Sequence, residues 1–174
     1  MKTLLLIADG FEDLSVFLPW YRLREANIEV QLASPFMHCL TGQHGYRIEP
    51  DLAIRDVNPA EYDLLLIPDG IAVECLRQVE EAVAVTRTFV QENNGRIAAL
   101  GHGPQLLISA GTLDGKAVTC SPGIRDDVRM AGAVYRDEAT VLDGSLLTGR
   151  SIDELPEFCR SLAKLMRMAA DVRG

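Results

Sequence analysis

Short apolar runs without alternating polar residues recur along this chain, and they constrain its fold more than any other feature. Residues 4–7 and 64–67 are apolar on both faces, and residues 96–100 form a third such run. Strands of this kind are typical of the centre of a parallel sheet, whose strands are joined by crossover helices. We therefore predict one α/β domain over residues 1–174, a doubly wound, flavodoxin-like sandwich with a mostly parallel central sheet and helices on both faces.

The segments between these runs supply the remaining elements. Apolar residues recur at helical spacing, and alternation at residues 28–33 predicts another strand. Residues 39–51 read as a hairpin or an irregular excursion, and residues 141–148 as a hairpin around Asp143-Gly144. The predicted helices cover residues 14–26, 79–91 (stopped by Asn93-Asn94-Gly95), 104–110 and 152–169.

Composition excludes several classes of function. The chain carries 17 Lys+Arg against 25 Asp+Glu, a net charge of −8, and its basic residues are not clustered, which argues against nucleic-acid and anionic-membrane surfaces. The apolar start ends at Asp9, too early for a signal peptide, and no run reaches the length of a membrane span. The four cysteines form no C-x-x-C pair, which disfavours zinc and redox dithiols. We expect a cytoplasmic protein without cofactor or metal.

The most informative local motif is Gly101-His102-Gly103-Pro104-Gln105, directly after the run at 96–100. It reads as a strand that turns sharply into a helix, with Pro104 in the first helical turn. Enzymes of the α/β class place a nucleophile at such a turn. Here that residue is Gly101, which has no side chain with which to attack a substrate.

Three side chains that can exchange protons follow predicted strands: Glu12, Glu74 and His102. A single surface glutamate is usually only solvated. In doubly wound sheets, however, ligands bind beyond the carboxyl ends of the strands. The shared position of the three residues therefore favours a common site.

The motifs of this chain resemble those of the DJ-1/PfpI superfamily. Residues 99–107 resemble its nucleophile elbow, A-[IV]-C-H-G-P-x-x-L, and residues 10–13 resemble its first loop, which supplies a glutamate. Residues 67–70 resemble its [LI]-P-G-G turn. Residues 41–45 and 121–127 resemble the PfpI branch in particular, so the resemblance spans nearly the whole chain.

The resemblance implies a role for each site residue. The family's reactive cysteine would stand at position 101, with Glu12 as its carboxyl partner and His102 as the adjacent imidazole. A glutamate from a neighbouring subunit, matching Glu74, would orient the histidine, which implies a homodimer or a hexamer built from dimers. Backbone N–H groups of Gly70 and His102 would form an oxyanion hole. The family's peptidase, glyoxalase III-type and deglycase reactions all depend on the thiolate.

Three departures from the family pattern fall at this site. Gly101 replaces the cysteine, Asp69 replaces the first glycine of the P-G-G turn, and Ser121 stands where close relatives often have tyrosine. Clustered departures favour natural divergence over an engineered change. If Gly101 were the only change that removes the family's thiol-dependent activity, Gly101→Cys would restore that activity. Asp69 and Ser121 are expected to line the pocket.

Cys120 offers an alternative nucleophile, because the resemblance places its loop beside the elbow; the competing interpretation is a cysteine packed in the core. Cys75 is weighed in the same way. A metal held by His102, Glu12 and a neighbour's Glu74 is a further alternative that the spacing does not require.

The sequence leaves three hypotheses for function. The preferred one is a thiol-independent acid–base enzyme that acts on a small carbonyl-like or unsaturated substrate through Glu12, His102 and a neighbour's Glu74. The second is a non-catalytic member that binds a small molecule or acts as an oligomer. The third is an inactivated form of a PfpI-type glyoxalase III, deglycase or peptidase-like enzyme.

Overall fold

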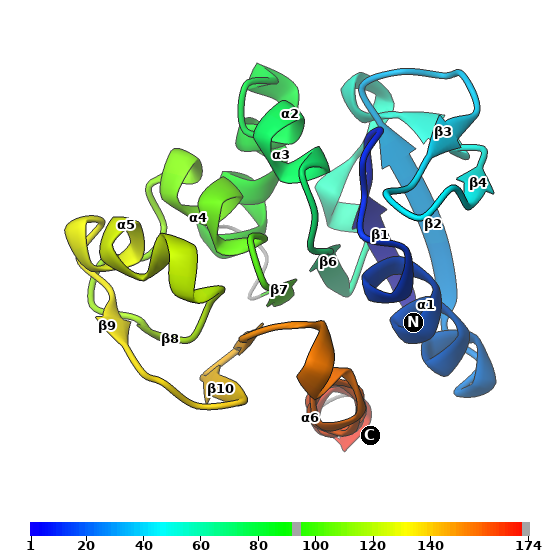
Figure 1. Cartoon of the computed structure of the whole chain (residues 1–174). Helices are drawn as coiled ribbons and strands as arrows, with labels where there is room; N and C mark the ends of the chain where they lie inside the picture. The colour runs from blue at the N-terminus through cyan, green and yellow to red at the C-terminus, as the bar shows by residue number, and fades with distance from the viewer. Residues whose placement is uncertain (92–94, 172–174) are drawn as a thin grey trace.

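A seven-stranded sheet forms the centre of the protein, as a computed structural model of residues 1–91 and 95–171 describes it (Figure 1). All neighbouring strands run parallel except the pair β10–β11. This confirms the predicted α/β class. The strand order is β10 (Thr140–Asp143), β11 (Leu146–Gly149), β7 (Arg96–Leu100), β6 (Leu64–Ile67), β1 (Lys2–Leu6), β2 (Glu29–Ser34) and β5 (Leu52–Ala53).

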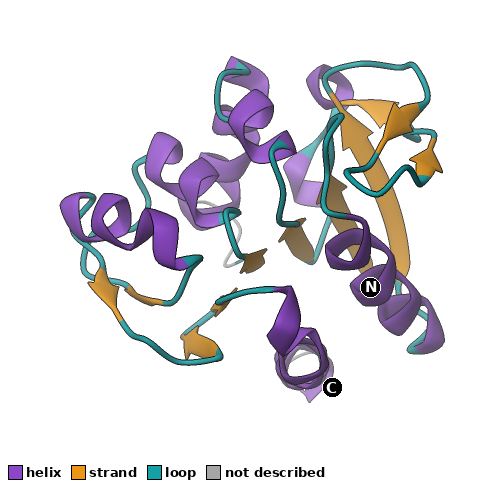
Figure 2. Ribbon diagram, in the orientation of Figure 1, coloured by secondary structure: helices purple, strands orange, loops and turns teal. Residues whose placement is uncertain are grey.

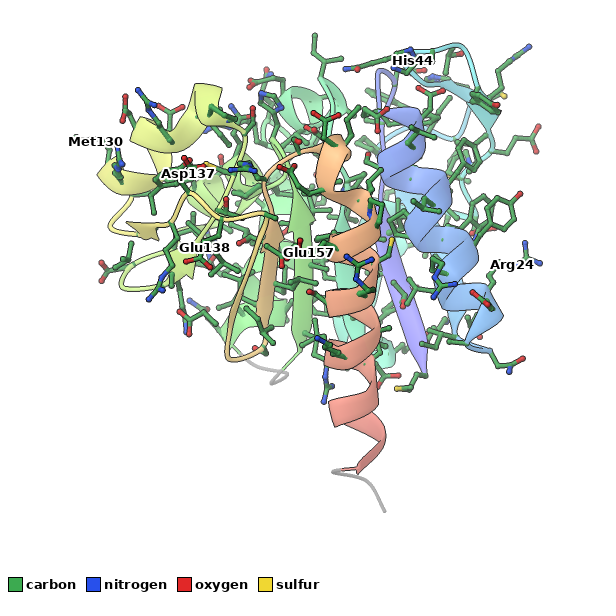
Figure 3. The ribbon with its side chains drawn as sticks, turned by 60° about the horizontal axis from the view of Figure 1, so that its bottom comes forward. Arg24, His44, Met130, Asp137, Glu138 and Glu157 are labelled. Atoms are coloured by element: carbon green, nitrogen blue, oxygen red, sulfur yellow. The ribbon has the colours of Figure 1, made fainter. Side chains whose placement is uncertain are left out.

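Helices cover both faces of the sheet (Figure 2). On one face α1 (Asp13–Glu25) packs against α6 (Leu155–Asp171), and Figure 3 shows the two side by side, with His44 at the end of the molecule opposite the C-terminus of α6. On the other face α4 (Pro104–Ala110) packs against three helices. These are α2 (Ala72–Leu76), α3 (Glu80–Gln91) and α5 (Arg125–Met130).

The central strands are buried as their apolar runs predict. Every residue of β6 is buried, and so are residues 3–6 of β1 and 97–100 of β7. Burying one leucine or isoleucine side chain contributes roughly 1.5–3 kcal/mol, so these three strands anchor the fold. Their position matters because the loops at their carboxyl ends carry the candidate site.

Smaller elements surround this frame. The segment predicted as a hairpin or an excursion is an antiparallel hairpin of β3 (Leu40–Thr41) and β4 (Arg47–Ile48). A second small sheet pairs β8 (Ala117–Val118) with β9 (Val134–Tyr135) in parallel. Four single turns of 3-10 helix complete the set: η1 (Ile54–Asp56), η2 (Pro59–Glu61), η3 (Pro122–Ile124) and η4 (Ile152–Glu154).

The predicted helices and hairpins agree with these bounds to within a few residues. The helix predicted to start at residue 152 begins as η4 and continues as α6. Gly111 ends α4 with a φ of +69°, in the left-handed region that favours glycine. Asn93 and Asn94 of the stop signal predicted for α3 lie outside the described residues. Across the described ranges, no helix is long and apolar enough to cross a membrane.

The direction of winding changes between β1 and β6. From β1 the chain proceeds to β2 and β5 on one side, then returns to β6 on the other side and continues to β7 and β11. In doubly wound sheets this switch point opens a crevice at the carboxyl ends of the strands.

Candidate functional site

Three neighbouring strands deliver the candidate site at this switch point. Glu12 follows β1, Asp69-Gly70 follows β6 and Gly101-His102 follows β7. Their loops border a cavity of about 540 Å³. The polar side chains that line it include Glu12, His44, Asp69, Glu74, His102 and Gln105.

Gly101 forms the sharp turn that the sequence predicts, with a φ of +57°. The space beside Gly101 is occupied, although the residue has no side chain of its own. A Cβ on residue 101 would lie 2.1 Å from both Cγ and Oδ2 of Asp69. The Asp69 carboxylate therefore fills the space into which a side chain at position 101 would project. Two of the three departures from the family pattern are thus in direct contact.

The same carboxylate occupies the predicted oxyanion hole. Asp69 Oδ1 accepts hydrogen bonds from the backbone N–H of Gly70 at 2.7 Å and of His102 at 2.8 Å. The His102 ring adds a third bond from Nδ1 at 2.8 Å, and since a carboxylate can only accept, Nδ1 carries the proton. The two N–H groups converge as predicted, but they bind the protein's own carboxylate. Their role toward a substrate oxyanion stays a prediction, because in this arrangement Asp69 fills the position that such an oxygen would take.

These contacts shift the pKa values of both Asp69 and His102. Burial alone would raise the pKa of Asp69, but the hydrogen bonds from the His102 ring, from its backbone N–H and from Gly70 outweigh burial and lower the pKa. The bond to Asp69 raises the pKa of His102 against the opposing effect of burial, and the charges of Asp69 and Glu74 act in the same direction. The arrangement therefore favours an Asp69 carboxylate beside an imidazolium.

Glu12 is held by the start of α1, where it is the N-cap residue. Its Oε2 accepts the backbone N–H of Ser15 at 2.7 Å, and the residue is only 4% exposed. Its Oε1 is buried and accepts no hydrogen bond from the described residues, and the same is true of Gln105 Oε1. Buried polar atoms normally have partners. Two residues of the cavity lining therefore each carry a buried oxygen whose hydrogen-bonding capacity is unused among the described residues.

Glu74 lies on α2 and contributes to the cavity of its own chain. Its charge raises the pKa of His102, while its Oε1 lies 4.0 Å from Nη1 of Arg77. Glu74 of the same subunit therefore lies at the site even without a neighbouring subunit. The role of Glu74 across a subunit interface stays a prediction.

The structure decides between the two interpretations of Cys120 and corrects one expectation, that for Ser121. Cys120 is fully buried, as the core-packing interpretation has it. Its burial, followed by the charge of Asp127, raises its thiol pKa to about 12, so it is not a thiolate near neutrality. Burial also raises the pKa of Cys75. Ser121 lies outside the cavity lining; its backbone N–H donates to the Gly101 carbonyl at 2.9 Å and so supports the elbow.

Sequence reasoning missed the contribution of the β3–β4 loop. His44 lines the cavity, and its Nε2 lies 3.7 Å from Glu12 Oε1. Ligand atoms of Glu12, Asp13 and His44 lie within 4.8 Å of one another, a group other than the His102-centred set considered for a metal. Asp13 accepts the backbone N–H groups of His44 and Tyr46, which explains its burial as an anchor of the loop. The only signal for this loop was its likeness to the PfpI branch.

Known proteins share the sequence pattern of this chain. A sequence model of the DJ-1/PfpI family matches residues 1–165. The chain belongs to the DJ-1/PfpI family. Deglycase PfpI of Pyrococcus furiosus is 41% identical over 167 residues, covering 96% of this chain and 100% of that protein. An uncharacterized protein of Archaeoglobus fulgidus is 44% identical, covering 96% and 99%.

Solved structures agree with the fold of this DJ-1/PfpI protein. A two-domain protein of Anabaena variabilis, containing DJ-1/ThiJ/PfpI-like and ferritin-like domains, superposes with a TM-score of 0.92 at 31% identity, over 97% of this chain and 50% of that one. DJ-1 of Schizosaccharomyces pombe superposes with a TM-score of 0.85 at 21% identity, over 94% of this chain and 90% of that one.

Proposed function

We propose that this DJ-1/PfpI protein is a thiol-independent enzyme that performs acid–base chemistry on a small carbonyl-like or unsaturated substrate. The observation that carries this proposal is the Asp69–His102 pair, which stands at the elbow in place of a thiol. With Nδ1 bound to Asp69, the Nε2 atom of His102 is the ring nitrogen left to exchange a proton with a ligand.

The surrounding side chains support such a role. Glu12 presents a buried oxygen without a partner among the described residues, and Glu74 adds a second carboxylate on the same cavity. Acid–base catalysis by positioned groups of this kind contributes typically 10²–10⁴-fold in rate. The deglycase names of relatives do not transfer directly, because Gly101 cannot form the covalent thiol intermediate on which that chemistry depends.

The contact between Asp69 and residue 101 also bears on the third hypothesis. A single cysteine-to-glycine inactivation of an ordinary family enzyme would leave a glycine in the P-G-G turn. Here Asp69 replaces that glycine and fills the space that the cysteine would need. The pair of changes therefore supports a site that has diverged as a unit. The occupied oxyanion hole, in contrast, favours the non-catalytic binding protein. An experiment must therefore distinguish that protein from the acid–base enzyme.

Exchange of α-protons provides a direct assay, because it needs proton transfer but no thiol. Dihydroxyacetone is incubated with the protein in deuterium oxide and followed by proton NMR. We expect exchange above the buffer rate, reduced roughly 10²-fold or more in His102→Gln and Glu12→Gln. The matched control Cys120→Ser should behave as wild type. Exchange at the buffer rate, or exchange unaffected by His102→Gln, would favour the binding protein.

A further inference from the structure

The two oxygens of Asp69 have different surroundings. Oδ1 accepts all three hydrogen bonds from Gly70 and His102, whereas Oδ2 accepts none from the described residues. Oδ2 lies 2.1 Å and Oδ1 2.4 Å from the position of a Cβ on residue 101, so the whole carboxylate occupies the space into which an elbow side chain would project. What distinguishes the two oxygens is that Oδ1 is held in the oxyanion hole and Oδ2, the closer of the two to that Cβ position, is not.

We propose that Asp69 Oδ2 is a nucleophile for substrates with an electrophilic tetrahedral carbon, of which an epoxide is the simplest class. This inference rests on the proposed function in one respect, that the site is catalytic without a thiol, and it adds a covalent step and a substrate class. Attack by a carboxylate would give a labile hemiacylal from an aldehyde or ketone, and a labile anhydride from an acyl substrate. Attack on a tetrahedral carbon gives an ordinary ester, which water can cleave.

The first step opens the ring. Asp69 Oδ2 forms a bond to the epoxide carbon while the carbon–oxygen bond of the ring breaks and its electron pair stays on oxygen. That oxygen takes a proton from the His102 imidazolium. The product is a hydroxyalkyl ester of Asp69 beside a neutral imidazole, and no oxidant or reductant takes part.

The second step hydrolyses the ester. Neutral His102 takes a proton from water, whose oxygen bonds to Cγ of Asp69, and negative charge develops on Oδ1. The N–H groups of Gly70 and His102 already point at Oδ1, so they stabilise this charge without rearrangement. The bond between Cγ and Oδ2 then breaks, and the alkoxide takes back the proton from His102. The new Asp69 carboxyl passes its remaining proton to His102, which restores the carboxylate and the imidazolium. The sum is epoxide plus water giving a diol, whose new oxygen comes from Asp69.

The remaining features of the site fit this sequence of steps. The lowered pKa of Asp69 keeps it ionised near neutrality. Glu12 and His44, whose Oε1 and Nε2 atoms lie 3.7 Å apart, stand on the same cavity lining, where the attacking water would bind. Cys120 is fully buried, so its thiol does not compete for the electrophile.

Heavy-oxygen water tests the inference on the wild-type protein. The protein, in excess, is incubated with phenyl glycidyl ether in water enriched in the heavy isotope, and the peptide that contains Asp69 is analysed by mass spectrometry. We expect one heavy oxygen in Asp69 and none in the first diol released. Diol that carries heavy oxygen, with Asp69 unlabelled, would mean direct attack by water and would overturn the inference, leaving the acid–base proposal standing. Absence of both diol and adduct would also overturn it.

Variants locate the nucleophile independently. We expect a trapped ester on Asp69 after rapid acid quenching, lost in Asp69→Asn and retained in the matched surface variant Asp126→Asn, whose side chain is 76% exposed. An adduct on Glu12, Glu74 or Cys75 would overturn the assignment. If Asp69→Asn does not fold, as thermal melting would reveal, the heavy-oxygen result on wild type decides. The dihydroxyacetone exchange assay reports separately on the acid–base proposal.

Discussion

At the scale of single residues, the contact between Gly101 and Asp69 changes the obvious rescue experiment. Gly101→Cys alone would place Cβ 2.1 Å from the Asp69 carboxylate, so we expect it to lower the free energy of unfolding by roughly 1–3 kcal/mol and to give no thiol-dependent activity. Asp69→Gly combined with Gly101→Cys removes the clash and should recover most of that loss. Urea unfolding of both single variants and the double variant measures the coupling, and additive effects would contradict a direct contact.

The Asp69–His102 pair predicts a pH dependence of stability. The raised pKa of His102 means that its contribution is complete below the ordinary value of 6.5 and is lost as pH rises through the folded value. The lowered pKa of Asp69 means that its contribution is present above 3.8 and is lost as pH falls through the folded value. The pair should therefore stabilise the folded protein most between pH 3.8 and pH 6.5, the ordinary pKa values of the two groups.

Unfolding of wild type and His102→Gln by urea across this range checks the prediction. The imidazole is 42% exposed, so solvent screens its charge. We therefore expect the two proteins to differ in free energy of unfolding by at most ~1 kcal/mol. The difference should shrink both toward alkaline pH and toward strongly acid pH. A difference independent of pH would show that the ion pair does not form in solution.

At the scale of elements, the turn after β6 depends on Gly70. This residue has a φ of +112°, and a Cβ there would lie 2.4 Å from the backbone nitrogen of Glu12. Because a backbone atom cannot move aside without disturbing the chain, we expect Gly70→Ala to lower the free energy of unfolding by roughly 2 kcal/mol or more. It should also disturb the hydrogen bond from the Glu12 N–H to the Asp69 carbonyl.

Gly144→Ala is the matched control for Gly70→Ala. Its φ is +60°, but nothing lies within 4 Å of its Cβ position, so only the backbone penalty of roughly 1–2 kcal/mol applies. Thermal or urea unfolding compares the two variants. Equal losses would mean that the close approach of the β1 and β6 loops does not matter.

The same turn shows what the sequence could and could not predict. The strands β1, β6 and β7 follow from their apolar runs, since burial on both faces leaves little other choice. The helix α2 (Ala72–Leu76) was missed because five residues are too few for a helical period to emerge. The sequence showed that Asp69 and Gly101 depart from the family pattern, but not that they touch, because that contact arises only once β6 and β7 lie side by side.

At the scale of the whole molecule, the site sits at a surface that a second subunit could complete. Glu74 is half exposed on α2, and the neighbouring Ile71 is a large apolar residue that is 63% exposed beside the cavity. A partner that reaches His102 with its own Glu74 would have to cover this rim. Since a two-fold interface places the same patch on both subunits, Ile71 would be buried twice.

We therefore predict a dimer at micromolar concentration that depends on Ile71. Replacing it by arginine in Ile71→Arg would bury two unpaired charges, and we expect the dissociation constant to rise roughly 10²-fold or more, equivalent to ~3 kcal/mol. Met130→Arg, at an apolar residue that is 87% exposed at the end of α5, is the matched control (Figure 3). Sedimentation velocity distinguishes the outcomes. A wild-type protein that stays monomeric would remove the partner's Glu74 from the site and leave the Glu74 of the same chain, already within electrostatic reach of His102, as the second carboxylate.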